Sequence, residues 1–219
     1  MDRVLGIYGA GGLGREILEL AEQIDPGHER WDRIVFVNNG DPAAPVHQIE
    51  VISEEIAAER YKAQLDAVVA TGEPALRARI CHKLRTAGIP MVTLIHPGVH
   101  IPASTEIGEG VTIETGAVIS VDVRIGANTH IYANTVIAHD CRIGEHCVIC
   151  AGTQLSGDVV LGDRSFVGFG SGVKQGLRIG ADVIIGGGSA VFHDVPDETV
   201  VMGNPARVIR RNEAHRVFG

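Results

Sequence analysis

Aliphatic residues recur at every sixth position along the second half of the chain. From Ile101 to Val191, sixteen consecutive hexads begin with Ile, Leu or Val, and no residue is inserted between them. The residue four places further along each hexad is always small or aliphatic. This period predicts one short strand and one turn per hexad, with the first and fifth residues pointing inward. Three hexads would close one triangular coil of a parallel β-helix, stacked about 4.8 Å from the next coil.

The first half of the chain has a different pattern, in which short apolar runs alternate with amphipathic segments. We predict strands over residues 3–8, 33–37, 66–71 and 91–95, and helices over residues 15–24, 53–61 and 74–87. Alternating strands and helices indicate a parallel sheet covered by helices. Roughly ninety-five residues are too few for the complete dinucleotide-binding fold, which needs two such halves.

These patterns predict two domains and a tail. We expect an α/β, Rossmann-like half domain over residues 1–97 and an all-β parallel β-helix over residues 98–196. A C-terminal tail follows over residues 197–219. In this tail, residues 200–203 have the composition of a strand, and we expect a short helix from Ala206 onward.

Composition and charge narrow the class of protein. Aromatic residues make up only 4% of the chain, so Ile, Val and Leu must fill the core. The net charge of −8 disfavours nonspecific binding of nucleic acids, which depends on a basic surface. No apolar run approaches the about 20 residues of a membrane span, and the N-terminus has no signal-peptide pattern. Four cysteines do not make a disulfide scaffold in a chain of this length, so we expect a cytoplasmic protein.

A G-x-G-x-x-G motif occupies Gly9–Gly14, directly after a predicted strand and at the start of a predicted helix. In that context the backbone N–H groups and the helix N-terminus suit a phosphate. A dinucleotide site would also need an acid at the end of the second strand. That place holds Asn38 and Asn39, with Asp41 just beyond. We therefore predict a nucleotide-phosphate loop rather than an NAD site; a purely structural glycine turn is the alternative.

His139 and Asp140 form the candidate catalytic pair. His139 stands third in the hexad that begins at Ile137, so its side chain should project at or near an edge of the prism. A neutral histidine beside a carboxylate is suited to general-base catalysis near pH 7. By spacing alone, His130 and His146 are rival candidates for the base.

Cysteines and histidines cluster in the same coils and resemble a zinc ligand set, with a Cys147-x-x-Cys150 spacing. The hexad register argues against a metal, because Cys141 and Cys147 occupy the inward fifth place. We therefore interpret them as structural thiols and predict no metal site.

Glycines and arginines are concentrated near the C-terminal end of the repeats. Gly186–Gly188 would let a thin ligand lie close to the backbone, or would only close tight corners. Arg207, Arg210 and Arg211 add positive charge to an acidic chain. They would suit a phosphorylated cofactor, or only improve solubility.

Together these segments resemble the sialic-acid O-acetyltransferase and nucleotide-amino-sugar N-acetyltransferase family, the NeuD/PglD-like hexapeptide acyltransferases. The resemblance rests on the hexads and on YGAGGLGRE at 8–16, LIHP at 94–97, IAHDCRIGE at 137–145 and GNPAR at 203–207. It implies a left-handed β-helix, a homotrimer with active sites between subunits, and acetyl-CoA in a groove between adjacent prisms. It also implies acetyl transfer to the amine of a nucleotide-linked amino sugar, such as a UDP-linked 4-amino-4,6-dideoxy sugar.

The resemblance also implies roles for individual residues. His139 matches the family's general base, Asp140 its acidic neighbour, and Gly157 the backbone donor that faces the thioester oxygen. The expected cofactor contacts are Phe169, Gly187, Pro205 and Arg207. Pro205 and Arg207 belong to the tail, which is expected to pack near the acetyl-CoA groove. The expected sugar-nucleotide contacts are Gly11, Gly12, Leu13, Asn38, Asn39, Val69 and Gly72.

Two departures from the family pattern leave alternatives open. A close relative has paired Asp residues where this chain has Asn38 and Asn39, so the nucleobase stays undecided. A histidine that contacts acetyl-CoA in that relative is replaced here by Val148. There are two alternative functions. One is O-acetylation of a sialic-acid-like sugar, and the other is a non-catalytic role in which the protein binds sugar nucleotides or scaffolds partners.

Overall fold

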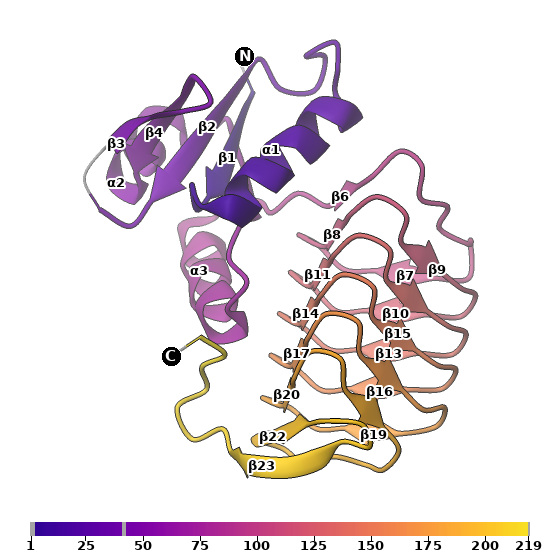
Figure 1. Ribbon diagram of the computed structural model, residues 1–219. Helices are drawn as coiled ribbons and strands as arrows, with labels where there is room; N and C mark the ends of the chain where they lie inside the picture. The colour runs from indigo at the N-terminus through magenta and orange to yellow at the C-terminus, as the bar shows by residue number, and fades with distance from the viewer. Residues whose placement is uncertain (1–2, 41–42, 219) are drawn as a thin grey trace.

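The computed structural model describes residues 3–40 and 43–218. An α/β domain stands beside one face of a triangular prism of short parallel strands (Figure 1). No helix in these described ranges is both long enough and apolar enough to span a membrane.

The α/β domain contains a five-stranded sheet in the order β3-β4-β2-β1-β5. Its strands are β1 (Val4–Tyr8), β2 (Arg33–Asn38), β3 (Ala43–Val46), β4 (Ile49–Ser53) and β5 (Leu65–Val69). Its helices are α1 (Gly12–Ile24), α2 (Glu54–Tyr61) and α3 (Pro74–Ala87). All strands are parallel except β3, which pairs antiparallel with β4. The predicted alternation of strands and helices is therefore confirmed.

The hairpin of β3 and β4 does not follow from the sequence pattern, because its residues carry weak signals. β3 is largely exposed and contains Pro45, so it lacks the apolar alternation of a buried strand. Its turn places His47 and Gln48 at φ 49° and 66°, a conformation that Asn and Gly usually mark.

The prism has three sheets, which we call sheets I, II and III. Sheet I contains β6 (Leu94–Ile95), β8 (Thr112–Ile113), β11 (His130–Ile131), β14 (Val148–Ile149), β17 (Phe166–Val167), β20 (Ile184–Ile185), β22 (Thr199–Met202) and β23 (Arg207–Arg211). Sheet II contains β9 (Val118–Ile119), β12 (Val136–Ile137), β15 (Gln154–Leu155), β18 (Gly172–Val173) and β21 (Ala190–Val191). Sheet III contains β7 (Glu106–Ile107), β10 (Arg124–Ile125), β13 (Arg142–Ile143), β16 (Val160–Leu161) and β19 (Arg178–Ile179).

The register confirms the predicted coil of three hexads. His130 pairs with Val148 in sheet I, and Val136 pairs with Gln154 in sheet II, each a separation of eighteen residues. The first-place aliphatic residues and the fifth-place residues from all three sheets form one buried core along the prism. Successive strands along the chain run III, I, II, so each turn lies at corner III/I, I/II or II/III.

The tail departs from its prediction. The expected strand is present as β22, but the helix expected from Ala206 is wrong, since residues 207–211 form β23. β23 pairs antiparallel with β22 at the end of sheet I. The short segment RVIRR has no strong preference for helix or strand, so its structure is determined by this pairing with β22 at the last coil.

The segment between the two domains also differs from its prediction. Residues 91–95 do not form one strand: Met91 makes an isolated bridge to Ala67 in the α/β domain. The short β6 that follows pairs with β8 and so belongs to sheet I of the prism. One apolar run thus belongs partly to each domain, and a prediction from apolar runs cannot locate the domain boundary inside it.

Candidate functional site

The imidazole of His139 lies at corner II/III, in the turn between β12 and β13. Its Nδ1 is 2.8 Å from Oδ2 of Asp140, and its side chain is 51% exposed. This hydrogen bond sets the ring orientation and leaves Nε2 without a partner among the described residues. The predicted pairing of His139 with Asp140 is therefore present, in a solvent-accessible place suited to proton transfer.

Gly157 stands one coil beyond His139 and makes room for the ring. A Cβ at Gly157 would lie 2.5 Å from Cε1 and 2.7 Å from Nε2 of His139, so any side chain would displace the imidazole. The N–H of Gly157 has no acceptor in the described part of the chain, whereas the next N–H, of Asp158, donates to the His139 carbonyl at 2.9 Å. An unpaired N–H beside a candidate base can stabilise a developing oxyanion.

The rival histidines are placed differently. His130 is fully buried, its Nε2 lies 2.9 Å from Oε1 of Glu114, and burial lowers its pKa. His146 is also buried, and burial together with the charge of Arg77 lowers its pKa to about 4. Neither ring can meet a substrate at the surface, so the structure favours His139 among the three.

Two cysteines of the same coils, Cys141 and Cys147, point into the prism, whereas Cys150 is half-buried and outside its core. Cys141 and Cys147 are fully buried, and each thiol lies 3.2 Å from a backbone carbonyl, those of Ser156 and Gly162. Burial raises the pKa of Cys147 to about 12, so its thiol stays protonated. Residues 3–40 and 43–218 contain no group of three or more His, Cys, Asp or Glu side chains that could hold a metal.

Two of the expected cofactor residues, Phe169 and Gly187, lie together at a different corner. Phe169 lies at corner I/II and is 71% exposed. A Cβ on Gly187, one coil further, would lie 2.8 Å from this ring, so the ring covers the bare backbone of Gly187. Pro205 and Arg207 follow at the turn into β23 and at its first residue. Within one chain, then, His139 and Phe169 do not share a groove.

The carboxyl ends of β1, β2 and β5 enclose a cavity of about 410 Å³. It lies at the point where the sheet order reverses around β1, the usual ligand position in open α/β sheets. Its lining residues are Tyr8, Gly9, Val37, Asn38, Asn39, Glu54, Ala70, Thr71, Leu76, Arg79, Ile80 and Lys83. Asn38 and Asn39 are thus in the cavity wall, while Val69 and Gly72 flank the lining pair Ala70 and Thr71. Asp41 lies outside the described residues.

The glycine loop has the geometry that its sequence predicts. Gly9 has φ 124°, and a Cβ there would lie 2.5 Å from the Ala70 carbonyl oxygen. At Gly11 and Gly12 a Cβ would have no atom within 4 Å, so their backbone is open to a ligand. Leu13 is half-buried in the first turn of α1. Sequence reasoning missed Arg79 and Lys83, which also line the cavity; Lys83 forms an ion pair with Glu54 of the same cavity at 3.0 Å.

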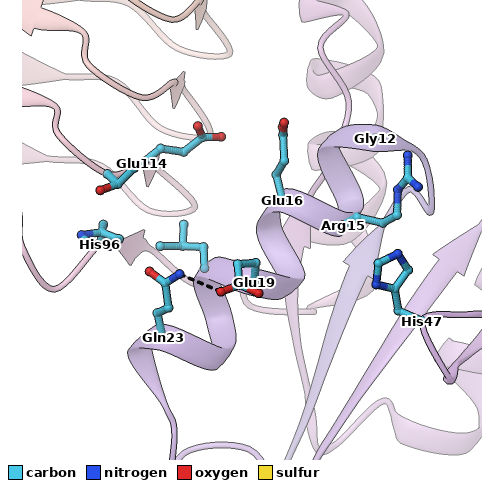
Figure 2. A pocket seen from close by; sticks show the side chains of 10 residues that line it. Gly12, Arg15, Glu16, Glu19, Gln23, His47, His96 and Glu114 are labelled. Atoms are coloured by element: carbon cyan, nitrogen blue, oxygen red, sulfur yellow. Dashed lines mark hydrogen bonds between the residues drawn. The ribbon is translucent and has the colours of Figure 1, made fainter.

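A second cavity, of about 490 Å³, lies between α1 and the first coils of the prism. Figure 2 shows Glu16, Glu19 and Gln23 projecting from α1 on the side where Glu114 and His96 lie. Gly12 is shared with the predicted phosphate loop. Sequence reasoning gave the other residues no role; Arg15, Glu16 and His96 appeared only within the YGAGGLGRE and LIHP runs that carry the family resemblance.

Both carboxylate oxygens of Glu114 in the second cavity have hydrogen-bond partners. Its Oε2 accepts the N–H of Ala133 at 3.1 Å, and its Oε1 meets Nε2 of the buried His130. Glu16 faces the same cavity, and its pKa is raised by partial burial and by the nearby charge of Glu114. The cavity wall is therefore negatively charged between Glu16 of α1 and Glu114 of the prism.

Comparison with known sequence families divides the chain in the same way as its fold. Residues 4–84 match the PglD N-terminal domain. Residues 122–157 match the bacterial transferase hexapeptide (six repeats), and residues 158–193 match the hexapeptide repeat of succinyl-transferase. No curated protein sequence matches the chain significantly.

Solved structures with the same two-domain arrangement cover almost the whole chain. The acetyltransferase domain of PglB from Neisseria gonorrhoeae FA1090 is 28% identical, with a TM-score of 0.88 over 95% of this chain and 100% of that one. WeeI from Acinetobacter baumannii AYE is 26% identical, with a TM-score of 0.90 over 95% and 100% of the two chains. PerB from Caulobacter crescentus, in complex with CoA and GDP-perosamine, is 32% identical, with a TM-score of 0.82 over 96% and 98%.

These likenesses extend over both domains rather than over the repeats alone. The identity with PerB exceeds 30% over nearly the full length of both chains. The matched N-terminal domain and the hexapeptide repeats confirm an α/β domain followed by a left-handed parallel β-helix. The chain therefore belongs to the PglD-like family of hexapeptide-repeat, acetyl-CoA-dependent sugar acetyltransferases.

Proposed function

We propose that this protein transfers the acetyl group of acetyl-CoA to the amine of a nucleotide-linked amino sugar, with His139 as the general base. The observation that carries the proposal is the exposed His139 ring, which is oriented by Asp140 and packed over the bare backbone of Gly157. PerB, a related structure, was solved with CoA and GDP-perosamine, and the PglB domain with acetyl coenzyme A. A UDP-linked 4-amino-4,6-dideoxy sugar is the proposed acceptor, and the cytoplasm, where acetyl-CoA is available, the proposed location.

The reaction proceeds by direct attack. The neutral amine of the sugar forms a C–N bond with the thioester carbon while Nε2 of His139 removes its proton. Asp140 stabilises the resulting imidazolium, and the N–H of Gly157 stabilises the oxyanion; one such donor is typically worth about 3 kcal/mol. The C–S bond then breaks, and the departing thiolate of CoA receives the proton from His139. A positioned base of this kind contributes about 10²–10⁴-fold.

The active site is assembled between subunits. The α/β domain packs on sheet I, whereas His139 lies at the opposite corner, II/III. Phe169 and Gly187 lie at corner I/II. In a trimer of parallel prisms with sheet II toward the axis, corner II/III of one protomer meets corner I/II of its neighbour. Acetyl-CoA would lie in this seam, with Phe169 and Gly187 along its pantetheine arm and Arg207 near its phosphates.

Sheet II suits this contact. Its outward residues are apolar or small at four of five coils: Val118, Val136, Gly172 and Ala190. Sheet III instead carries charged residues outward, such as Arg124 and Arg142. Sheet II is thus the face that would gain most from being covered.

The two cavities divide the acceptor between them. The 410 Å³ cavity takes the base and ribose, and the glycine loop takes the diphosphate. The 490 Å³ cavity starts at Gly12 and reaches Thr115 on corner I/II, so it takes the sugar. In a trimer whose three-fold axis is parallel to the prisms, equivalent coils of the three protomers lie at the same height along the axis. The carboxylate of Glu114, bound to the N–H of Ala133, would therefore lie near the level of the neighbour's His139, where it favours an amine over a hydroxyl.

Purified protein should be tested with acetyl-CoA and a panel of UDP- and GDP-linked 4-amino-4,6-dideoxyhexoses, following release of the free thiol of CoA. We expect thiol release with at least one member and a product that resists brief mild alkali, as an amide does. An alkali-labile product would indicate O-acetylation instead. Absence of both thiol release and acetyl-CoA binding by calorimetry would leave only a non-catalytic role.

A further inference from the structure

Arg77, in α3, is fully buried, and no carboxylate in the described parts of the chain pairs with its guanidinium. The guanidinium instead donates to carbonyl and amide oxygens. Nη1 reaches the carbonyls of Val69 at 2.9 Å and Thr71 at 3.0 Å, Nε reaches the carbonyl of Asn128 at 3.0 Å, and Nη2 reaches its Oδ1 at 3.1 Å. A buried cation with only neutral partners is unusual, because each partner must be accurately placed.

The acceptors belong to both domains. Val69 is the last residue of β5, and Thr71, two residues further on, lines the proposed nucleotide cavity. Asn128 lies in a turn at corner III/I of the prism, with φ 54°. Its amide Nδ2 donates back to the carbonyl of Arg77 at 3.2 Å and contacts Nδ1 of His146 at 3.0 Å. One side chain thus joins the rim of the cavity to the prism.

The chemistry of arginine makes this junction sensitive to position. Burial lowers the pKa of Arg77 to about 10, so the guanidinium is still charged at neutral pH. Its donors form a planar, rigid fork, and a shift of β5 or of the Asn128 turn would leave a buried donor unpaired. The contact therefore allows only a narrow range of positions for the end of β5 relative to the prism.

Docking of α3 to the prism does not by itself require Arg77. Arg85, further along the same helix, contacts Glu109 at 2.8 Å and Glu145 at 3.8 Å at the same corner. These ion pairs are exposed and do not touch β5. The feature that distinguishes Arg77 is its contact with the end of the strand that the nucleotide would meet.

We propose that Arg77 is a positioning residue, which holds the nucleotide-binding end of β5 in register with the prism so that an anchored nucleotide sugar presents its amine to the acetyl group. The inference rests on the proposed function, because it assigns to Arg77 the coupling between nucleotide binding and transfer. Binding energy from a part of the substrate that does not react is useful only when that part is rigidly connected to the reacting centre.

Two variants weaken the junction in different ways. Arg77→Lys keeps the charge but removes the fork. Asn128→Gly suits the turn at φ 54° and keeps the backbone carbonyl, but removes Oδ1 and Nδ2. Arg85→Ala is the matched control, since it loses contacts of the same helix with the same corner. If one variant fails to fold, the other still tests the junction.

The first measurement is the preference for a nucleotide-linked amino sugar over the same sugar without its nucleotide. In both variants we expect this ratio of kcat/KM to fall at least about tenfold, while the rate with the free sugar changes less than about twofold. Arg85→Ala should keep the wild-type ratio. An equal loss with both acceptors would show a general structural role, and an unchanged ratio would show no role; either result overturns the proposal.

The second measurement does not depend on catalysis. Amide hydrogen exchange should accelerate in residues 69–73 of both variants and stay unchanged in β1, and UDP or GDP should bind more weakly by calorimetry. If the wild-type enzyme acetylated neither acceptor, the proposed function would be wrong. Hydrogen exchange and nucleoside diphosphate binding would then test the role of Arg77 without any measurement of activity. Unchanged exchange and unchanged nucleoside diphosphate binding would overturn it.

Discussion

At the scale of single residues, the position of the His139 ring depends on the absence of a side chain at Gly157. The ring of His139 occupies the volume that a Cβ on Gly157 would fill, and Asp140 holds Nδ1. Asp140 itself adopts φ 63°, a left-handed conformation that Asp tolerates better than most residues. The proposed base is therefore oriented by its neighbour in sequence, Asp140, and by the next coil.

The first prediction concerns the base. His139→Asn should lower kcat at least about a hundredfold, because the amine loses its proton acceptor, while acetyl-CoA still binds. Steady-state kinetics at saturating acetyl-CoA, with calorimetry for cofactor binding, measures both effects. His82→Asn is the control, since His82 is an exposed histidine of α3 that lines neither cavity. A variant at His139 with near-normal turnover would remove this residue from the mechanism.

The second prediction concerns acid stability. His146 has a pKa of about 4 when folded, against an ordinary value of 6.5, so between these values the unfolded chain binds a proton that the folded chain does not. Its contribution to stability is therefore lost as the pH falls from 6.5 to about 4. His146→Asn keeps a left-handed turn and an acceptor for Asn128. Unfolding midpoints across this pH range should fall less steeply in the variant than in the wild-type protein; equal slopes would contradict the assignment.

At the scale of elements, every hexad from Ile107 to Ile185 combines an aliphatic first residue with a turn that has a positive φ. The fourth place of the hexads holds such residues, among them Asp122, Asn128, Asn134 and Asp158, with φ from 54° to 57°. The fifth place often holds Thr, Ser or Cys, whose polar hydrogen reaches a backbone carbonyl on the inner side, as in Thr129 and Ser165. The elements are very short, and stacking rather than local propensity stabilises them.

The third prediction tests this stacking. Ile137→Ala, in a middle coil, should lower the free energy of unfolding by about 2–5 kcal/mol, because neighbouring coils cannot collapse into the cavity. Ile107→Ala, near the first coil and only partly buried, should cost less. Chemical denaturation of the two variants gives the comparison. Equal losses would mean that the end coils are packed as tightly as the middle ones.

At the scale of the whole molecule, the arrangement of the domains separates the parts of the site. The α/β domain lies on sheet I, and the tail returns from the far end of the prism to the same side (Figure 1). There the carboxylate of Glu73 accepts the N–H groups of Val217 and Phe218. His139 remains on the opposite corner, which makes an assembly of several chains the natural way to complete the site.

The fourth prediction concerns that assembly. Replacing Val118 and Val136 together by Glu should dissociate the proposed trimer and abolish acetyl transfer, since like charges would be buried in the proposed sheet II contact. Light scattering after size-exclusion chromatography measures the mass, and thiol release measures the activity. Arg142→Glu on sheet III is the control and should leave both unchanged. A double variant that stays trimeric would exclude sheet II as the interface.

Much of the fold could be predicted because its repeats are local. The hexad period depends on residues six apart, so the coil and its inward places follow from the chain alone. Where pairing partners lie far apart in sequence, prediction failed: a helix was expected at β23, and β6 was assigned to the wrong sheet. The hairpin at β3 and β4 was missed because its turn residues are His47 and Gln48.

For the site, the order of residues along the chain was enough to predict the candidate groups: a glycine loop, a histidine beside an acid, and the period that places this histidine on a prism. Which histidine is accessible could be known only from the folded molecule, because burial depends on how the α/β domain covers sheet I. The same holds for the cavity beside Glu114 and the junction at Arg77, since both join segments of different domains. Local patterns encode coils and turns, whereas the separation of surfaces in space arises only when the domains pack together.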